Sequence, residues 1–65
     1  MITVNGTSQE YDMEISLHEL LVQLELENSL CAIEVNNELV SHTRRNECTL
    51  QDGDSVEIVS LVGGG

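Results

Sequence analysis

The spacing of apolar residues changes from the alternation of a strand to that of a helix within residues 15–24. These residues read Ile15-Ser16-Leu17-His18-Glu19-Leu20-Leu21-Val22-Gln23-Leu24. Leucine recurs there at intervals of three and four residues, which is one stripe of an amphipathic helix. Ser16 and Glu19 have the spacing of a capping box, and Ile15 can pack on Leu20 as a hydrophobic staple. The stretch therefore predicts a helix that begins after the serine and ends within residues 25–28. A helix this short needs tertiary packing to be stable.

Strand patterns precede this helix. Asn5-Gly6 is a dipeptide that readily adopts the type I′ turn of a two-residue hairpin. With this turn, Val4 lies opposite Thr7, and Ile2 lies opposite Gln9. Apolar and acidic side chains then alternate, which is typical of a strand with one buried face. The predicted buried side chains are Tyr11, Met13 and Ile15, and the wet ones are Glu10, Asp12 and Glu14.

Three further extended segments follow the helix. Residues 31–35 alternate between apolar and polar side chains and predict a strand, which leads through the Asn36-Asn37 turn into the apolar pair Leu39-Val40. Residues 41–47 are polar and irregular. A turn at residues 51–54 introduces a strand rich in β-branched residues over 55–62.

The order of these elements is hairpin, helix, strand, short strand, strand. One helix can bury its leucine stripe against one face of a mixed four- to five-stranded sheet, which predicts an α+β fold of the β-grasp (ubiquitin-like) type. A right-handed connection through the helix places the first and last strands side by side in the centre. We expect a single domain over residues 1–62 and a flexible glycine tail over 63–65. The predicted core face of the sheet carries Ile2, Val4, Tyr11, Met13, Ile33, Val35, Val56 and Ile58.

Composition excludes several classes of protein. Leu, Ile and Val make up 20 of the 65 residues, which is enough to drive folding despite the net charge of −10. The same charge argues against binding to nucleic acid or to an anionic membrane, since both require clustered Lys and Arg. No apolar run approaches the length of about 18 residues that a transmembrane helix needs. Two cysteines without C-x-x-C spacing and no signal peptide predict a cytoplasmic protein with reduced thiols.

The side chains that could support catalysis or bind a metal are few: His18, Cys31, His42 and Cys48. Neither histidine has a neighbouring nucleophile in the sequence, and the four residues match no zinc-ligand spacing. Asp52-Gly53-Asp54 is more simply a turn than part of a calcium loop. We therefore expect no enzyme activity and no metal site. Arg44 and Arg45 are expected to be solvated loop residues, the alternative being that they pair with acidic neighbours or with carboxylates of a partner.

Three glycines, Gly63, Gly64 and Gly65, directly follow the last strand. Such a segment is expected to be mobile, and fully extended it reaches about 10 Å beyond the sheet. Without Cβ atoms it can enter a channel too narrow for other residues, with the α-carboxylate leading. The alternative interpretation is a frayed end without function.

Several segments together resemble the sulfur carrier proteins of bacterial thiamine biosynthesis, the ThiS family. The resemblance extends over the whole chain, but it fails at residues 41–48, where the family often has a Pro-Arg pair and a tryptophan. The segments that carry it are Ile2-Thr3-Val4-Asn5-Gly6, Leu17-His18-Glu19-Leu20-Leu21, Val35-Asn36-Asn37-Glu38-Leu39-Val40, Asp52-Gly53-Asp54-Ser55-Val56-Glu57-Ile58-Val59 and Val62-Gly63-Gly64-Gly65.

The resemblance implies that the Gly65 carboxylate is the reactive group. An E1-like (ThiF-like) enzyme would adenylate it with ATP, and sulfur originating from cysteine would replace AMP. The resulting thiocarboxylate would be delivered to a thiazole synthase (ThiG-like). The chain would then bind no cofactor of its own, and Gly63 and Gly64 would thread into the partner.

Three alternative functions remain open from the sequence. The chain could carry sulfur to molybdopterin or another acceptor, it could be a ubiquitin-like modifier that is joined to lysines, or it could be a noncovalent interaction module. A docking surface follows from strand parity, because Val59 and Leu61 face away from Val56 and Ile58. Together with Val62 they form a predicted patch for the partner enzymes beside the tail.

Overall fold

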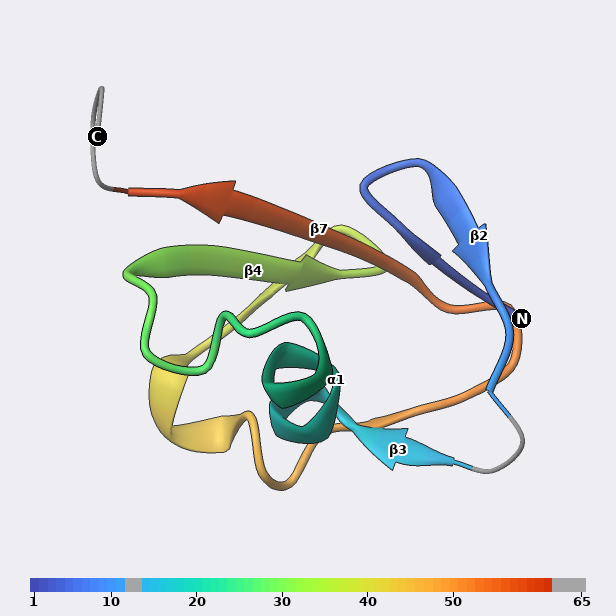
Figure 1. Cartoon of the computed structure of the whole chain (residues 1–65), viewed down its shortest axis with the longest axis horizontal. Helices are drawn as coiled ribbons and strands as arrows, with labels where there is room; N and C mark the ends of the chain where they lie inside the picture. The colour runs from blue at the N-terminus through green and yellow to red at the C-terminus, as the bar shows by residue number, and fades with distance from the viewer. Residues whose placement is uncertain (12–13, 62–65) are drawn as a thin grey trace.

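The computed structural model describes residues 1–11 and 14–61, and Figure 1 shows the helix lying beneath a twisted sheet. The last strand of this sheet ends at the side of the molecule opposite the N-terminus. The elements in chain order are β1 (Ile2–Val4), β2 (Thr7–Gln9), β3 (Ile15–Ser16), α1 (Leu17–Gln23), β4 (Cys31–Val35), β5 (Glu38–Val40), the 3-10 helix η1 (His42–Arg44), β6 (Thr49–Leu50) and β7 (Ser55–Ser60).

The main sheet has the strand order β2-β1-β7-β4-β5. β1 and β7 are parallel neighbours in its centre, as the right-handed crossover predicted, and the other pairs are antiparallel. The predicted hairpin register is confirmed, because Val4 pairs with Thr7 and Ile2 pairs with Gln9. This mixed five-stranded sheet with one helix across it is a β-grasp fold.

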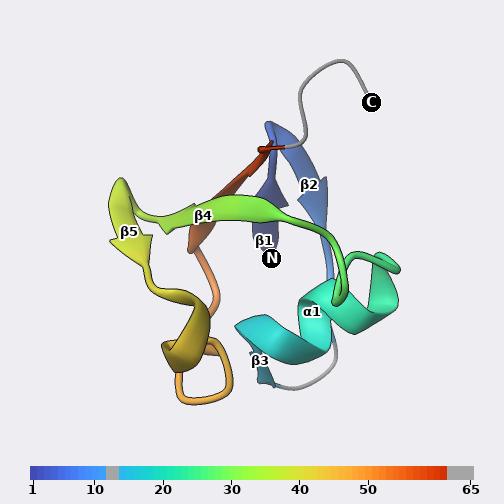
Figure 2. The same cartoon turned by 90° about the vertical axis from the view of Figure 1, so that its left-hand side faces the viewer.

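A second, two-stranded sheet was not predicted. β3 pairs with β6 through Ile15 and Leu50, and Figures 1 and 2 place β3 on the far side of α1 from β4. The alternation before the helix suggested one strand continuing the hairpin, which is wrong, since β2 ends at Gln9 and β3 joins a different sheet. Alternating apolar and polar residues indicate that one side of an extended backbone is buried, but they do not indicate which strand it pairs with. Met13 lies outside the described residues.

The capping box at the start of α1 is confirmed. The Ser16 Oγ accepts a hydrogen bond from the Glu19 backbone N–H at 3.0 Å, and the Glu19 carboxylate accepts one from the Ser16 N–H at 3.0 Å. These two bonds satisfy donors that the first turn of a helix leaves free. Ile15 and Leu20, the predicted staple, are both buried in the core.

The helix ends at Gln23, before the predicted range of 25–28. Glu25 adopts a left-handed φ of 60°, and its N–H donates to the carbonyl of Val22 at 3.0 Å. The N–H of Leu26 donates to the carbonyl of Leu21 at 2.8 Å, which completes a Schellman motif. A motif of this kind usually has glycine at the left-handed position, so its sequence signal is absent here.

The core lies between α1 and one face of the main sheet. It confirms the predicted core face for the residues on strands, whereas Tyr11 packs against the core from outside any strand and Met13 is not described. Figure 2 shows α1 lying across the sheet beneath β4. The fully buried residues include Leu17, Leu20 and Leu21 of the helix stripe, as well as Ile33 of β4 and Val56 of β7. Tyr11, Val35 and Ile58 pack against this cluster with partial exposure.

Candidate functional site

β7 holds the described end of the chain against β4. Cys31 pairs with Ser60, and just beyond β7 the N–H of Leu61 donates to the carbonyl of Leu30 at 2.9 Å. The chain therefore leaves the sheet beside the residue that precedes β4. Val62 and the three glycines predicted to form the reactive tail lie outside the described residues.

An exposed apolar surface lies at this point. Val59 is 58% exposed and Leu61 is 56% exposed, whereas Val56 is fully buried, which confirms the predicted strand parity. Leu30 is 64% exposed and continues the same face, because the β4–β7 register places Ala32 opposite Val59. We call Leu30, Val59 and Leu61 the outer patch. Leu30 was not among the predicted patch residues, although it lies two positions before Ala32 and so shares its side of the strand.

A groove of about 550 Å³ opens beside the outer patch. The loop over residues 27–30, the first residue of β4, and the side chains of His42, Arg45 and Leu61 line it. We call it the tail-base groove, because Leu61 is the last described residue. Leu30 and Leu61 belong to both the groove and the outer patch.

Arg45 is the buried polar residue of this groove, with only 6% of its surface exposed. Its Nη2 donates to the carbonyl of Cys31 at 2.8 Å, while its buried Nε has no hydrogen-bond partner. Within residues 1–11 and 14–61, no carboxylate lies within salt-bridge distance of its guanidinium. The expectation that Arg45 is solvated is wrong, whereas Arg44 is exposed as expected.

The backbone explains why Arg45 is buried. The first turn of α1 has free N–H groups, and those of His18 and Leu17 donate to the carbonyls of Arg45, at 3.2 Å, and Cys48, at 2.7 Å. These bonds fix the backbone of residues 45–48 against the start of the helix. The Arg45 side chain is thereby held inside, where it meets the first carbonyl of β4.

The other candidate groups remain dispersed. Cys31 is buried and Cys48 half-buried, both with free thiols, and His18 and His42 are exposed. Burial, and to a smaller extent the charge of Asp54, raises the pKa of the Cys48 thiol. In the part of the chain that the structure describes, no three His, Cys, Asp or Glu residues are grouped to hold a metal ion. No helix in the described ranges is long and apolar enough to cross a membrane.

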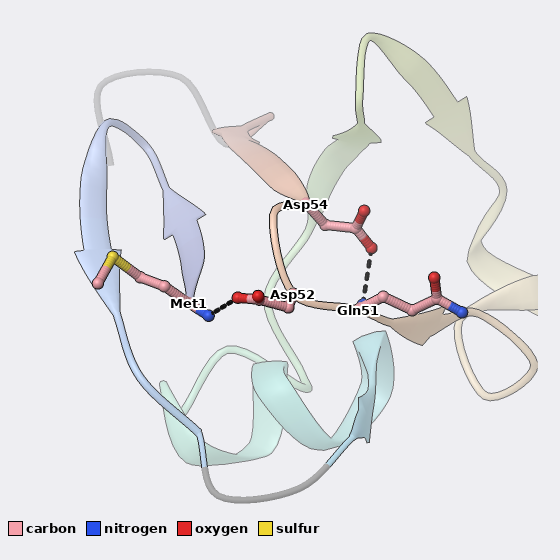
Figure 3. A network of polar contacts seen from close by, with 4 residues as sticks. All are labelled: Met1, Gln51, Asp52 and Asp54. Carbon is pink, nitrogen blue, oxygen red and sulfur yellow. Dashed lines mark hydrogen bonds and ion pairs between the residues drawn. The ribbon is translucent and has the colours of Figure 1, made fainter.

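The predicted turn at Asp52-Gly53-Asp54 is confirmed at the opposite end of the molecule. Figure 3 shows the amino group of Met1 paired with the Asp52 carboxylate, and the Gln51 N–H donating to Asp54 at 2.8 Å. The hydrogen bond from the N-terminal ammonium, reinforced by its charge, lowers the pKa of Asp52. Gly53 has a φ of 96° and donates its N–H to the carbonyl of Met1 at 2.8 Å.

Comparison with known proteins agrees with this fold. The model of the ThiS family matches residues 2–65. The chain belongs to the ThiS family. It is 35% identical over 66 aligned positions to the sulfur carrier protein ThiS of Bacillus subtilis (strain 168), with full coverage of both chains.

Two further similarities extend this ThiS-family assignment. The crystal structure of the thiamine biosynthesis protein ThiS from Geobacter metallireducens superposes with a TM-score of 0.83 at 31% identity, covering 98% of this chain and 97% of that one. A thiazole synthase of Paramagnetospirillum magneticum (strain ATCC 700264 / AMB-1) is 30% identical over 64 residues. That match covers 98% of this chain and 20% of the synthase.

Proposed function

We propose that this chain carries sulfur on the α-carboxylate of Gly65. The chain is a sulfur carrier protein of thiamine biosynthesis and not an enzyme. A free α-carboxylate has a pKa of about 3.3–3.7, so it is ionised at pH 7 and is a poor electrophile. The carboxylate therefore has to be activated before sulfur can replace one of its oxygens.

Activation is assigned to an E1-like (ThiF-like) enzyme. That enzyme joins the Gly65 carboxylate to the AMP portion of ATP and releases pyrophosphate. A sulfur nucleophile at the oxidation level of sulfide, originating from cysteine, then attacks the acyl carbon and expels AMP. The product is a C-terminal thiocarboxylate, which a thiazole synthase (ThiG-like) consumes. ATP belongs to the partner in this scheme, and the carrier binds no cofactor.

The geometry near the tail supports this role. The outer patch lies on the strand that leads to the tail, where an enzyme holding Gly63 and Gly64 would also contact Val59, Leu61 and Val62. An apolar patch of this kind is typical of docking surfaces. The net charge of −10 favours basic surfaces on the partners.

The distribution of amines also supports a carrier. The two basic residues are both arginine, so the chain has no lysine to attack its own activated carboxylate. Its α-amino group is held by Asp52 at the side of the molecule opposite the end of β7 (Figure 1). An adenylate at Gly65 would therefore be shielded from reaction within the same molecule.

One observation favours a thiazole synthase as the enzyme that receives the sulfur, and another favours the cytoplasm as the location of the carrier. A carrier-like segment makes up part of the P. magneticum synthase, as expected if a carrier and a synthase work in contact. Both thiols of this chain are free, which suits a reducing compartment.

The proposal is tested by ATP–pyrophosphate exchange with the E1-like enzyme of the same organism. We expect exchange that depends on the carrier, and none with a variant lacking Gly65 or with one extended by an alanine after Gly65. The Glu38→Ala variant, which changes an exposed residue on the edge strand β5, serves as the control and should support exchange. Exchange by the variant lacking Gly65 would contradict the proposal.

A further inference from the structure

Arg45 forms the wall of the tail-base groove as a buried cation without a counter-ion among the described residues. Its one hydrogen bond goes to the neutral carbonyl of Cys31, and its Nε is unsatisfied. Burial of a charge is costly unless an opposite charge and hydrogen bonds compensate for it. Among the described residues, no group therefore neutralises this charge, which favours an anion as the occupant of the groove.

The remaining walls restrict the nature of this anion. Leu30 and Leu61 are apolar, and His42 can contribute a hydrogen-bond donor. Glu27 also lines the groove, but it is exposed and does not pair with Arg45. A guanidinium presents a planar fork of N–H donors that matches a carboxylate. A carboxylate on a short apolar stem, as in aspartate or glutamate, fits both the cation and the leucines.

We propose that the tail-base groove receives an aspartate or glutamate side chain of the thiazole synthase. This inference rests on the proposed function, because the protein that holds the tail must also cover the groove beside Leu61.

The test compares two arginine substitutions by isothermal titration against the thiazole synthase of the same organism. Arg45→Met and Arg44→Met remove the same charge, but only Arg45 is buried. We expect Arg45→Met to weaken binding by about tenfold or more, as when one member of a buried ion pair is lost. The exposed Arg44 should change binding by less than about twofold.

A stability measurement separates a docking role from a structural one. Methionine removes the buried, unpaired charge and also the hydrogen bond from Nη2 to the Cys31 carbonyl, and these two effects on stability oppose each other. The Tm of free Arg45→Met should therefore differ little from that of the wild type. If Arg45→Met does not fold, Arg45→Lys is used in the titration instead. Lysine keeps the positive charge but lacks the planar N–H donors of the guanidinium. If Glu27→Gln lowers the Tm and leaves binding unchanged, the counter-ion is internal and the proposal is wrong.

A double-mutant cycle identifies the partner group. Each surface aspartate and glutamate of the synthase is changed to its amide and titrated against the wild-type carrier and Arg45→Met. One such change should weaken wild-type binding and have no further effect on Arg45→Met. Equal binding of both arginine variants, or no coupled acidic residue, would overturn this inference alone. No binding of the wild-type carrier would instead count against the proposed function.

Discussion

The two ends of the molecule differ in how completely their charged groups are paired. At the N-terminal end, the amino group of Met1 pairs with Asp52, and Asp54 accepts a hydrogen bond from the Gln51 N–H (Figure 3). Asp54 also accepts one from the side chain of Asn36. At the tail end, Arg45 is buried with no counter-ion in residues 1–11 and 14–61, and the outer patch is exposed. The first arrangement is complete within the fold. In the docking proposal a partner completes the second, so substitutions at the two ends should have opposite consequences.

The largest effect is expected from breaking the outer patch. Leu61→Asp places a charge in an apolar contact and should weaken binding to the thiazole synthase by about thirtyfold or more. The Tm of the free chain should change little, because Leu61 is 56% exposed. Titration calorimetry and thermal melting measure the two quantities.

Leu39→Asp is the matched control for this prediction. Leu39 is 71% exposed and lies on the edge strand β5, away from the end of β7. It should retain most of the binding. If a folded Leu61→Asp variant bound the synthase as tightly as the wild type, the outer patch would not be a docking surface for it.

The N-terminal end should respond in the opposite way. Asn36 has a φ of 52°, its side chain donates to Asp54 at 3.0 Å, and it accepts from the Ser55 N–H at 3.0 Å. Asn36→Ala loses both bonds and is strained at positive φ, so it should lose about 1–2 kcal/mol of stability. Binding to the synthase should be unaffected.

Urea unfolding measures this loss, with the exposed Glu38→Ala variant on the adjacent strand as control. A weakened interaction of folded Asn36→Ala with the synthase would mean that the two ends are not separate in function.

A smaller, stabilising effect is expected at the end of the helix, in the segment that leads to the tail-base groove. Glycine adopts the left-handed φ of Glu25 without strain, so Glu25→Gly should gain about 0.5–1 kcal/mol. Glu27→Gly is the control, and since Glu27 has no positive φ it should gain nothing. Loss of stability in Glu25→Gly, measured by urea unfolding, would argue against the Schellman motif.

The smallest effect concerns the exposed Met1–Asp52 pair. Its carboxyl pKa is lowered in the folded chain, so the pair stabilises the fold above the unfolded pKa of about 3.9 and this contribution is lost as the pH falls through the folded value. Asp52→Asn should therefore have a slightly lower Tm at pH 7, and the difference should disappear in acid. A difference that persists at low pH would exclude this ion pair as its cause.

The sequence predicted the elements whose signals are local. The capping box of Ser16, the Asn5-Gly6 hairpin and the parity of β7 each depend on residues a few positions apart. The pairing of Ile15 with Leu50 and the burial of Arg45 depend on residues brought together by the fold. No local pattern marks an arginine whose own carbonyl binds the start of a helix. The sequence therefore predicted the exposed apolar residues at the end of β7. It did not predict that Arg45, in residues 41–48, is buried beside them.

Intact-mass measurement of the carrier isolated from cells grown with limiting thiamine tests the central claim most directly. The account predicts a population heavier by the difference between one sulfur and one oxygen atom. Tandem fragmentation should place this difference at Gly65, and a matched sample from thiamine-replete cells should contain less of it. Gly65 joined to lysines of other proteins, with no sulfur-containing form in either sample, would contradict the account and indicate a protein modifier.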